Sequence, residues 1–193
     1  PNKMIHKKRR EELLSILGDD AVVIVSTNSE QKRNSDVNYP FRPDSSFWYL
    51  TGFIEPDAIA VFSKNNYSIF LRPKDKTQEI WNGVRLGVDL APETLLVDYA
   101  YDINTFTDEI KKLINKESSL YFDQPTSDGW KNRASTNILN KTIVSIFSSS
   151  IQPLNPYLSE MRIIKDASEV KNMQTAANLA SKAHMKAMVK TQP

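Results

Sequence analysis

The chain has 193 residues, of which 40% are hydrophobic and 25% are charged, proportions typical of globular rather than disordered proteins. Its 25 basic and 23 acidic residues leave a formal net charge of +2, which argues against nucleic acid or an anionic membrane as a partner. The sequence has no cysteine, which excludes disulfides and thiolate metal sites, and no apolar run long enough to span a bilayer, so we expect a cytoplasmic protein.

The chain begins with a predicted helix and a predicted buried strand. Leucines share one face of residues 7–17 and Gly18 follows them, which predicts a helix. The basic cluster 7–10 is expected on the solvated face of this helix, and His6 is expected in solvent. The Val- and Ile-rich run 21–25 is typical of a buried strand.

A proline-stiffened loop, residues 33–53, follows the strand. Its two prolines fix the backbone locally, and Asp44 or Ser45 can cap a short helical turn that ends at Gly52. The loop also carries six aromatic residues and several charged ones. From the residues alone, two interpretations stay open: aromatics that fill gaps in the core, or a rim that presents charged groups to a ligand.

The next two strands are predicted to form a hairpin. Residues 58–63 and 67–71 flank a turn-prone tripeptide, so the two strands should be antiparallel and the sheet mixed. A short helix capped by Asp75 is expected to end at Trp81, beside a glycine. Residues alone favour a core position for this tryptophan over a projecting one.

The remaining elements alternate between helix and strand, and this alternation predicts an α/β fold: a mixed β-sheet flanked by helices. The expected elements are a helix from Asp102 or Asn104 to Asn115, a strand at 120–122, a helix at 128–139 and a strand at 142–147.

The chain is expected to divide into a domain at 1–152, a linker at 153–165 and a long helix at 166–193. Two prolines break the pattern in the linker, and Asp166 with Glu169 forms a capping-box-like start to the helix. The helix has a stripe of small residues that would pack closely on a partner. His184 lies on this stripe and is expected to be a packed or boundary residue rather than a metal ligand. We therefore expect the helix to belong to a further domain.

Motifs with direct catalytic chemistry are missing from the sequence. The carboxylates have no recognisable metal-ligand spacing, and there is neither a glycine-rich phosphate loop nor a nucleophile elbow. We therefore expect no catalytic residue and no metal ligand within these 193 residues.

Several separated motifs occur in the order found in one known family. They lie at residues 33–36, 39–42, 46–53, 55–56, 79–87, 91–93 and 160–165. Together they resemble the N-terminal domain of aminopeptidase P (Xaa-Pro aminopeptidase), a member of the creatinase/prolidase-like metallopeptidase superfamily. The resemblance implies that residues 1–152 are this domain and that 166–193 open the "pita-bread" catalytic domain.

The resemblance also implies a function. Such enzymes remove the N-terminal residue of a peptide whose second residue is proline, using two divalent metal ions, typically manganese, held in the C-terminal catalytic domain. The N-terminal domain supports homo-oligomerisation and shapes the active-site entrance. Its expected partners are therefore the catalytic domain of the same chain, further copies of the chain and the peptide substrate.

Five rim residues are implied by the resemblance: Asp36, Tyr39, Arg42, Trp81 and Arg85. Asp36 would pair with an arginine of the catalytic domain, and Tyr39 and Arg42 would extend the rim. Trp81 would reach across a subunit interface to the substrate region, with Arg85 orienting its loop.

The sequence departs from the family at Asn82 and Val84, where relatives often carry bulkier or more basic residues, which leaves the reach of this loop open. Two alternative functions also stay open. In the first alternative, the parent is a catalytically inactive peptidase-like protein that binds a peptide or protein. In the second, it is a prolidase-type dipeptidase.

Overall fold

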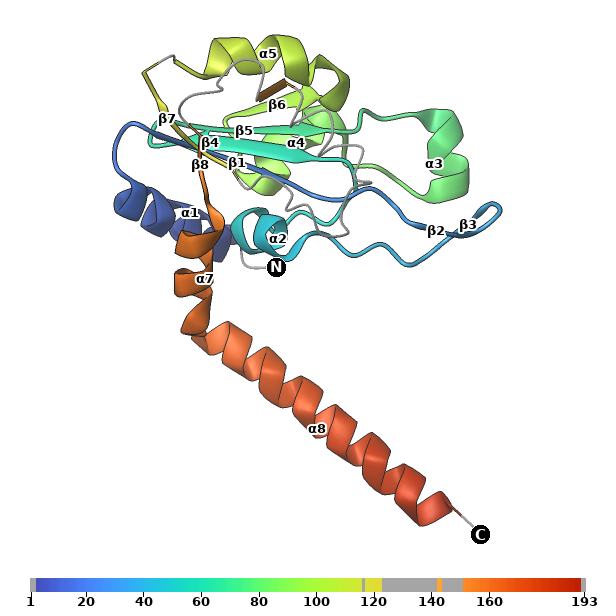
Figure 1. The fold of residues 1–193 in the computed structure, drawn as a ribbon. Helices are drawn as coiled ribbons and strands as arrows, with labels where there is room; N and C mark the ends of the chain where they lie inside the picture. Colours follow the sequence, from blue (N-terminus) through green and yellow to red (C-terminus); the bar gives the residue numbers. More distant parts are fainter. Residues whose placement is uncertain (1–2, 116, 123–141, 144–150, 192–193) are drawn as a thin grey trace. The chain divides into compact units, whose positions relative to one another are not determined.

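The computed structural model describes residues 3–115, 117–122, 142–143 and 151–191 (Figure 1). The chain forms two compact units, Pro1–Pro156 and Tyr157–Pro193. Helix α7 (Asn155–Ile163) occupies much of the stretch 153–165 that was expected to be a linker. The domain boundaries themselves stay a prediction.

The first unit is built on a six-stranded sheet with the order β6-β5-β4-β1-β7-β8. β4 runs antiparallel to both of its neighbours, whereas the other adjacent pairs in this sheet are parallel. The predicted mixed sheet and the β4–β5 hairpin are therefore confirmed. The strands are β1 (Ala21–Ser26), β4 (Ile59–Ser63), β5 (Asn66–Leu71), β6 (Tyr99–Asp102), β7 (Ser119–Tyr121) and β8 (Ile151–Gln152).

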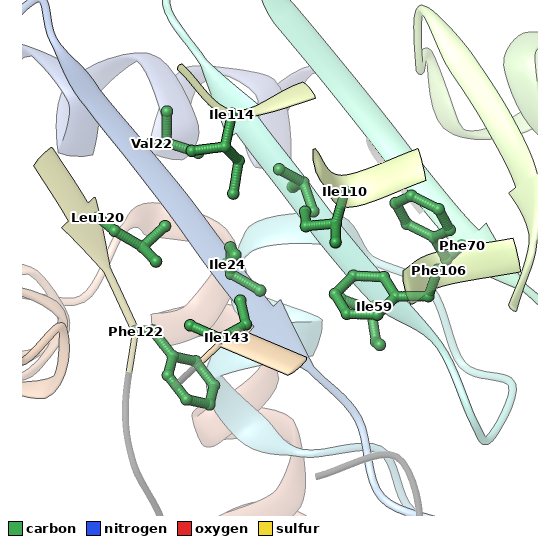
Figure 2. Packing of buried hydrophobic residues seen from close by; sticks show 11 residues of the cluster. Val22, Ile24, Ile59, Phe70, Phe106, Ile110, Ile114, Leu120, Phe122 and Ile143 are labelled. Atoms are coloured by element: carbon green, nitrogen blue, oxygen red, sulfur yellow. The ribbon is translucent and has the colours of Figure 1, made fainter. Parts of the chain in front are cut away.

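One face of the sheet packs against helix α5 (Phe106–Leu113) (Figures 1 and 2). The ring of Phe106 lies edge-on to Phe70 of β5 at 5.0 Å, and Ile110 is fully buried in the same cluster. Asp102 starts this region, because its carboxylate accepts a hydrogen bond from Asn104 N at 2.9 Å in a 3-10 turn (Ile103–Thr105). A helix is confirmed in this region, but Asp102 caps the 3-10 turn, and α5 itself follows Thr105 without a side-chain cap.

The other face is covered by α1 (Lys3–Leu17) and α2 (Ser45–Thr51) (Figure 1). Asp44 caps α2 by accepting hydrogen bonds from Ser46 N and Phe47 N at 2.9 and 3.1 Å. Gly52 ends the helix with φ at 68°, a left-handed conformation that favours glycine. With helices on both faces, β1 is buried on both sides, which explains its continuous apolar run.

Three side chains of α1 that were expected in solvent are buried: His6, Arg9 and Arg10. His6 Nδ1 lies 3.0 Å from the carbonyl oxygen of Tyr49, and Arg10 Nη1 donates to that of Leu50 at 2.7 Å. Arg9 Nη1 also donates to Tyr49 O, at 3.3 Å. These carbonyls belong to the last turn of α2, where no helical N–H can reach them. The solvated-face prediction is wrong here because α2 supplies the acceptors.

The two arginines also lie on aromatic rings. Their guanidinium carbons are 3.9 Å (Arg9) and 3.7 Å (Arg10) from the ring centroids of Tyr49 and Tyr67. Burial raises the pKa of Tyr67 to about 12, while the charge of Arg10 acts to lower it. Only the two lysines of the basic cluster are exposed as expected.

Other parts of the fold differ from the sequence prediction. Helix α4 (Gly87–Leu95) and strand β6 were not predicted. Thr142 and Ile143 are helical and buried, so the strand expected at 142–147 is wrong for these two residues. The rest of that range and the helix expected at 128–139 lie outside the described residues.

The second unit contains the long helix α8 (Ala167–Lys190). The predicted capping box is confirmed: Asp166 accepts a hydrogen bond from Glu169 N at 3.0 Å, and the Glu169 carboxylate accepts one from Asp166 N at 2.9 Å. None of the residues of α8 is buried. His184 is exposed on this helix, and its expected packing against a further domain stays a prediction.

Candidate functional site: the β2–β3 hairpin and the α3 loop

Two segments project past the same end of the sheet in Figure 1: the β2–β3 hairpin and helix α3. The hairpin consists of β2 (Lys32–Asn34) and β3 (Val37–Asn38), a short pair that the sequence did not predict within the 33–53 loop. Asp36 lies in the turn between the strands and is exposed. The preceding Ser35 has φ at 41°, which makes the turn tight.

A cavity of about 360 Å³ lies next to the hairpin. Tyr39 and Arg42, two of the predicted rim residues, both line it. The Arg42 carbonyl accepts a hydrogen bond from Asn28 Nδ2 at 3.1 Å, and its guanidinium donates to Ser45 Oγ at 3.3 Å. The other lining residues are Asn28, Ser29, Gln31, Pro40 and Phe41.

The polar residues that follow β1 were not predicted to belong to this cavity. Asn28, Ser29 and Gln31 come from a segment whose only sequence signal is its polarity, which is typical of any loop. The fold brings them against the 39–42 segment; for example, Tyr39 N donates to Gln31 O at 2.9 Å. The cavity thus combines amide and hydroxyl groups with aromatic rings and one guanidinium.

The second segment is residues 72–86, which we call the α3 loop. Its helix α3 (Lys76–Asn82) is capped by Asp75, which accepts hydrogen bonds from Thr77 N and Gln78 N at 3.0 and 3.1 Å, as predicted. Helix α3 has no buried residue. A contiguous apolar set is exposed at its tip: Ile80 (77%), Trp81 (82%) and Val84 (82%).

Trp81 is therefore not a core residue, and the interpretation that the residues alone favoured is wrong. The loop carries the indole away from the sheet because none of α3 packs on the core. An exposed apolar cluster of this kind is typical of a contact surface.

Arg85 lies at the base of the α3 loop and is half-buried. Its Nη1 donates to Pro73 O at 3.2 Å, and its backbone N donates to Glu79 Oε1 at 2.7 Å. The side chain therefore braces the loop against itself and does not extend toward the tip. Glu55, which was not predicted as a site residue, accepts a hydrogen bond from Leu86 N at 2.7 Å at the same base.

The two segments offer groups suited to making contacts. Across residues 3–115, 117–122, 142–143 and 151–191, no three histidine or acidic side chains come close enough together to hold a metal ion. Within the same residues, no helix is long and apolar enough to cross a membrane. What the segments offer is a planar indole, a carboxylate at a turn and a polar cavity.

Comparison with known proteins finds relatives of this chain by family model, by sequence and by structure. Residues 6–121 match the family model for the aminopeptidase P N-terminal domain. The Xaa-Pro aminopeptidase of Haemophilus influenzae is 37% identical over 191 residues, covering 97% of this chain and 43% of that protein. The chain thus spans less than half the length of this relative.

Solved structures agree with the family model. Proline aminopeptidase P II from Yersinia pestis matches with a TM-score of 0.86 and 28% identity, over 100% of this chain and 46% of that one. A variant of Escherichia coli aminopeptidase P, solved in complex with substrate, gives a TM-score of 0.88 and 29% identity over the same shares. The resemblance found in the motifs and the predicted α/β fold are confirmed, and the chain belongs to the aminopeptidase P N-terminal domain family.

Proposed function

We propose that this chain is the non-catalytic N-terminal domain of an Xaa-Pro aminopeptidase. The parent enzyme removes the N-terminal residue of a peptide whose second residue is proline. The observation that carries the proposal is the family match over residues 6–121, together with coverage of less than half of the related enzymes. Bond cleavage then belongs to the part of the parent outside the matched half.

In this proposal the hairpin and the α3 loop shape the active-site entrance. Asp36 pairs with a cation of the catalytic domain. Tyr39 and Arg42 contact the peptide from the polar cavity that they both line. The exposure of Asp36 and the position of Tyr39 and Arg42 on one cavity support these roles. Arg85 braces the α3 loop through its hydrogen bond to Pro73 O.

Trp81 is the contact we assign to a neighbouring subunit. The parent forms a homo-oligomer, and the indole of one subunit reaches the substrate region of the next, where its flat apolar face packs on the proline ring and excludes water. Its 82% exposure beside two further apolar side chains supports this assignment. We place the parent in the cytoplasm, as the cysteine-free sequence predicts.

The metal ions belong to the rest of the parent in this proposal. Two divalent ions, with manganese as the expected element, would generate hydroxide at neutral pH and polarise the scissile carbonyl. The described residues of this chain do not provide a set of ligands for them. This chain's own contribution is to position the peptide and limit the access of water.

The test compares this chain with its complete parent on the peptide Arg-Pro-Pro in the presence of manganese. We expect the parent to release arginine and the 193-residue chain to release none. Metal-dependent release by the chain alone would overturn the proposal. A parent that binds the peptide without cleaving it would instead identify an inactive peptidase-like binding protein.

A further inference from the structure

The α3 loop returns to the sheet close to the point where it left. Arg85 Nη1, near the end of the loop, donates to the carbonyl of Pro73 near its start. Just beyond the loop, Gly87 has φ at 71°, and a Cβ built there would lie 2.6 Å from Lys74 Cγ. The two ends of the loop are therefore in direct contact, and glycine is required at 87.

Glu55 lies outside the loop and contacts both of its ends. Its Oε1 accepts the hydrogen bond from Leu86 N at 2.7 Å, and its Oε2 lies 3.6 Å from Arg72 Nη2. The side chains of Glu55 and Arg72 are only 18% and 20% exposed. A largely buried pair is less screened by water and salt than a surface pair, so this contact helps to hold the base of the loop.

Glu55 Oε2 and Arg72 are paired at a largely buried place in the described part of the chain. Glu55 Oε2 and Arg72 Nε have no hydrogen-bond partner there, so the ion pair is the interaction available to Glu55 Oε2. If Glu55 were removed, the Arg72 charge would be left largely buried without its counter-charge.

Apolar packing does little to hold the loop in place. Helix α3 buries no residue, and a cavity of about 360 Å³ lies beside the base, lined by both Glu55 and Leu86. Side chains next to an open cavity lack packing partners on that side. The position of the loop therefore depends on polar contacts at its base.

We propose that Glu55 is a positioning residue: by holding Leu86 and Arg72, it fixes the α3 loop and so sets where Trp81 stands. The functional part of this proposal rests on the proposed role of Trp81 at the active-site entrance. The structural part, that Glu55 holds the loop, stands on the contacts alone.

The structural part is tested by amide hydrogen exchange over residues 76–86. We expect Glu55→Ala to raise exchange across the loop at least tenfold, and Glu55→Gln to raise it less, because the amide oxygen still accepts from Leu86 N. Asp98→Asn is the matched control, since Asp98 Oδ2 also accepts a backbone hydrogen bond at 2.7 Å, from Tyr67 N, but touches no part of the loop.

A second variant breaks the same hydrogen bond from the donor side. Leu86→Pro removes the N–H, and the φ of −61° at Leu86 is one that proline adopts. We expect it to open the loop while the Arg72 pair stays intact. Unchanged loop exchange in folded Glu55→Ala and Leu86→Pro would overturn the proposal.

The functional part is tested in the complete parent with a double-mutant cycle. We expect Trp81→Ala and Glu55→Ala each to lower kcat/KM for peptides longer than three residues by about tenfold, and the double variant to lose no more than either single variant, because both act through the same indole. A loss for Trp81→Ala with none for Glu55→Ala would overturn the positioning role. No loss for Trp81→Ala, with raised loop exchange in Glu55→Ala, would overturn the role of Trp81 and leave the restraint of the loop by Glu55 supported.

Discussion

At the scale of single residues, His6 is a buried histidine whose ring proton makes a hydrogen bond to the backbone. A carbonyl oxygen can only accept a hydrogen bond, so the Nδ1 that faces Tyr49 O carries the proton in the neutral ring. Trp48 lies edge-on to the ring at 5.5 Å, and a Cβ on Gly52 would come within 2.6 Å of it. The ring is buried among these neighbours, and one side of it borders the cavity that Glu55 and Leu86 also line.

The pKa of His6 is accordingly lowered from its ordinary value of 6.5. Burial is the main cause, and the charges of Arg9 and Arg10 act in the same direction, whereas the hydrogen bond to the Tyr49 carbonyl acts against it. Below pH 6.5 the imidazole of His6 takes up a proton in the unfolded chain, whereas the folded chain disfavours the protonated ring.

We therefore expect the His6 contribution to the free energy of unfolding to be fully present above pH 6.5 and to be lost as the pH falls through the lowered folded pKa. Urea unfolding of wild type and His6→Asn across pH 4.5–8 measures it, and the pH dependence should weaken in the variant. His184→Gln is the control, because that side chain is exposed. An identical pH dependence in wild type and His6→Asn would contradict the assignment.

At the scale of elements, the joint between α1 and α2 is made by cations and carbonyls. Arg10→Ala removes the donor to Leu50 O and the contact with the Tyr67 ring, so we expect a loss of about 2–4 kcal/mol in the free energy of unfolding. Lys7 is in the same basic cluster, but it is exposed and its ion pair with Glu11 is long, at 3.9 Å. Lys7→Ala should therefore change the free energy of unfolding by less than about 0.5 kcal/mol. Thermal or urea unfolding measures both variants. Equal losses for Arg10→Ala and Lys7→Ala would contradict a stabilising role for the contacts of Arg10 with α2 and Tyr67.

Elements with local signals were predictable from the sequence, and elements without them were not. Asp75 and Asp166 were predicted as caps, and Asp44 was one of two candidates, because aspartate before a helix is a local signal. Each of the three accepts hydrogen bonds from the backbone N–H groups two and three positions later. Helix α4 was missed because it has no capping side chain and contains Pro92, a residue that usually interrupts a helix.

Long-range contacts explain the other errors. The acceptors for Arg9 and Arg10 lie 40 positions away in the chain, and no local pattern reveals them. At the candidate site, Tyr39 and Arg42 were predicted from the family resemblance of one short motif, and both line the same cavity. Glu55 was not identified as a site residue, because its contact with Leu86 spans 31 positions.

At the scale of the whole molecule, the two units differ in how much they bury. Ile110 is fully buried against the sheet in the first unit, so Ile110→Ala should lower the free energy of unfolding by about 2–5 kcal/mol. Leu179 on α8 is 63% exposed, and Leu179→Ala should cost less than about 0.5 kcal/mol. Chemical denaturation of both variants measures the contrast. A comparable loss for Leu179→Ala would show that α8 packs against a partner in solution.

The contact between the two ends of the α3 loop also bears on how this family can vary. Arg85 Nη1 donates to Pro73 O at 3.2 Å, so the side chain of one end of the loop is tied to the backbone of the other. Insertions or deletions between these anchors change the reach of the projecting segment without shifting the register of the strands. The length of the projecting segment can thus diverge among relatives while the underlying scaffold stays the same.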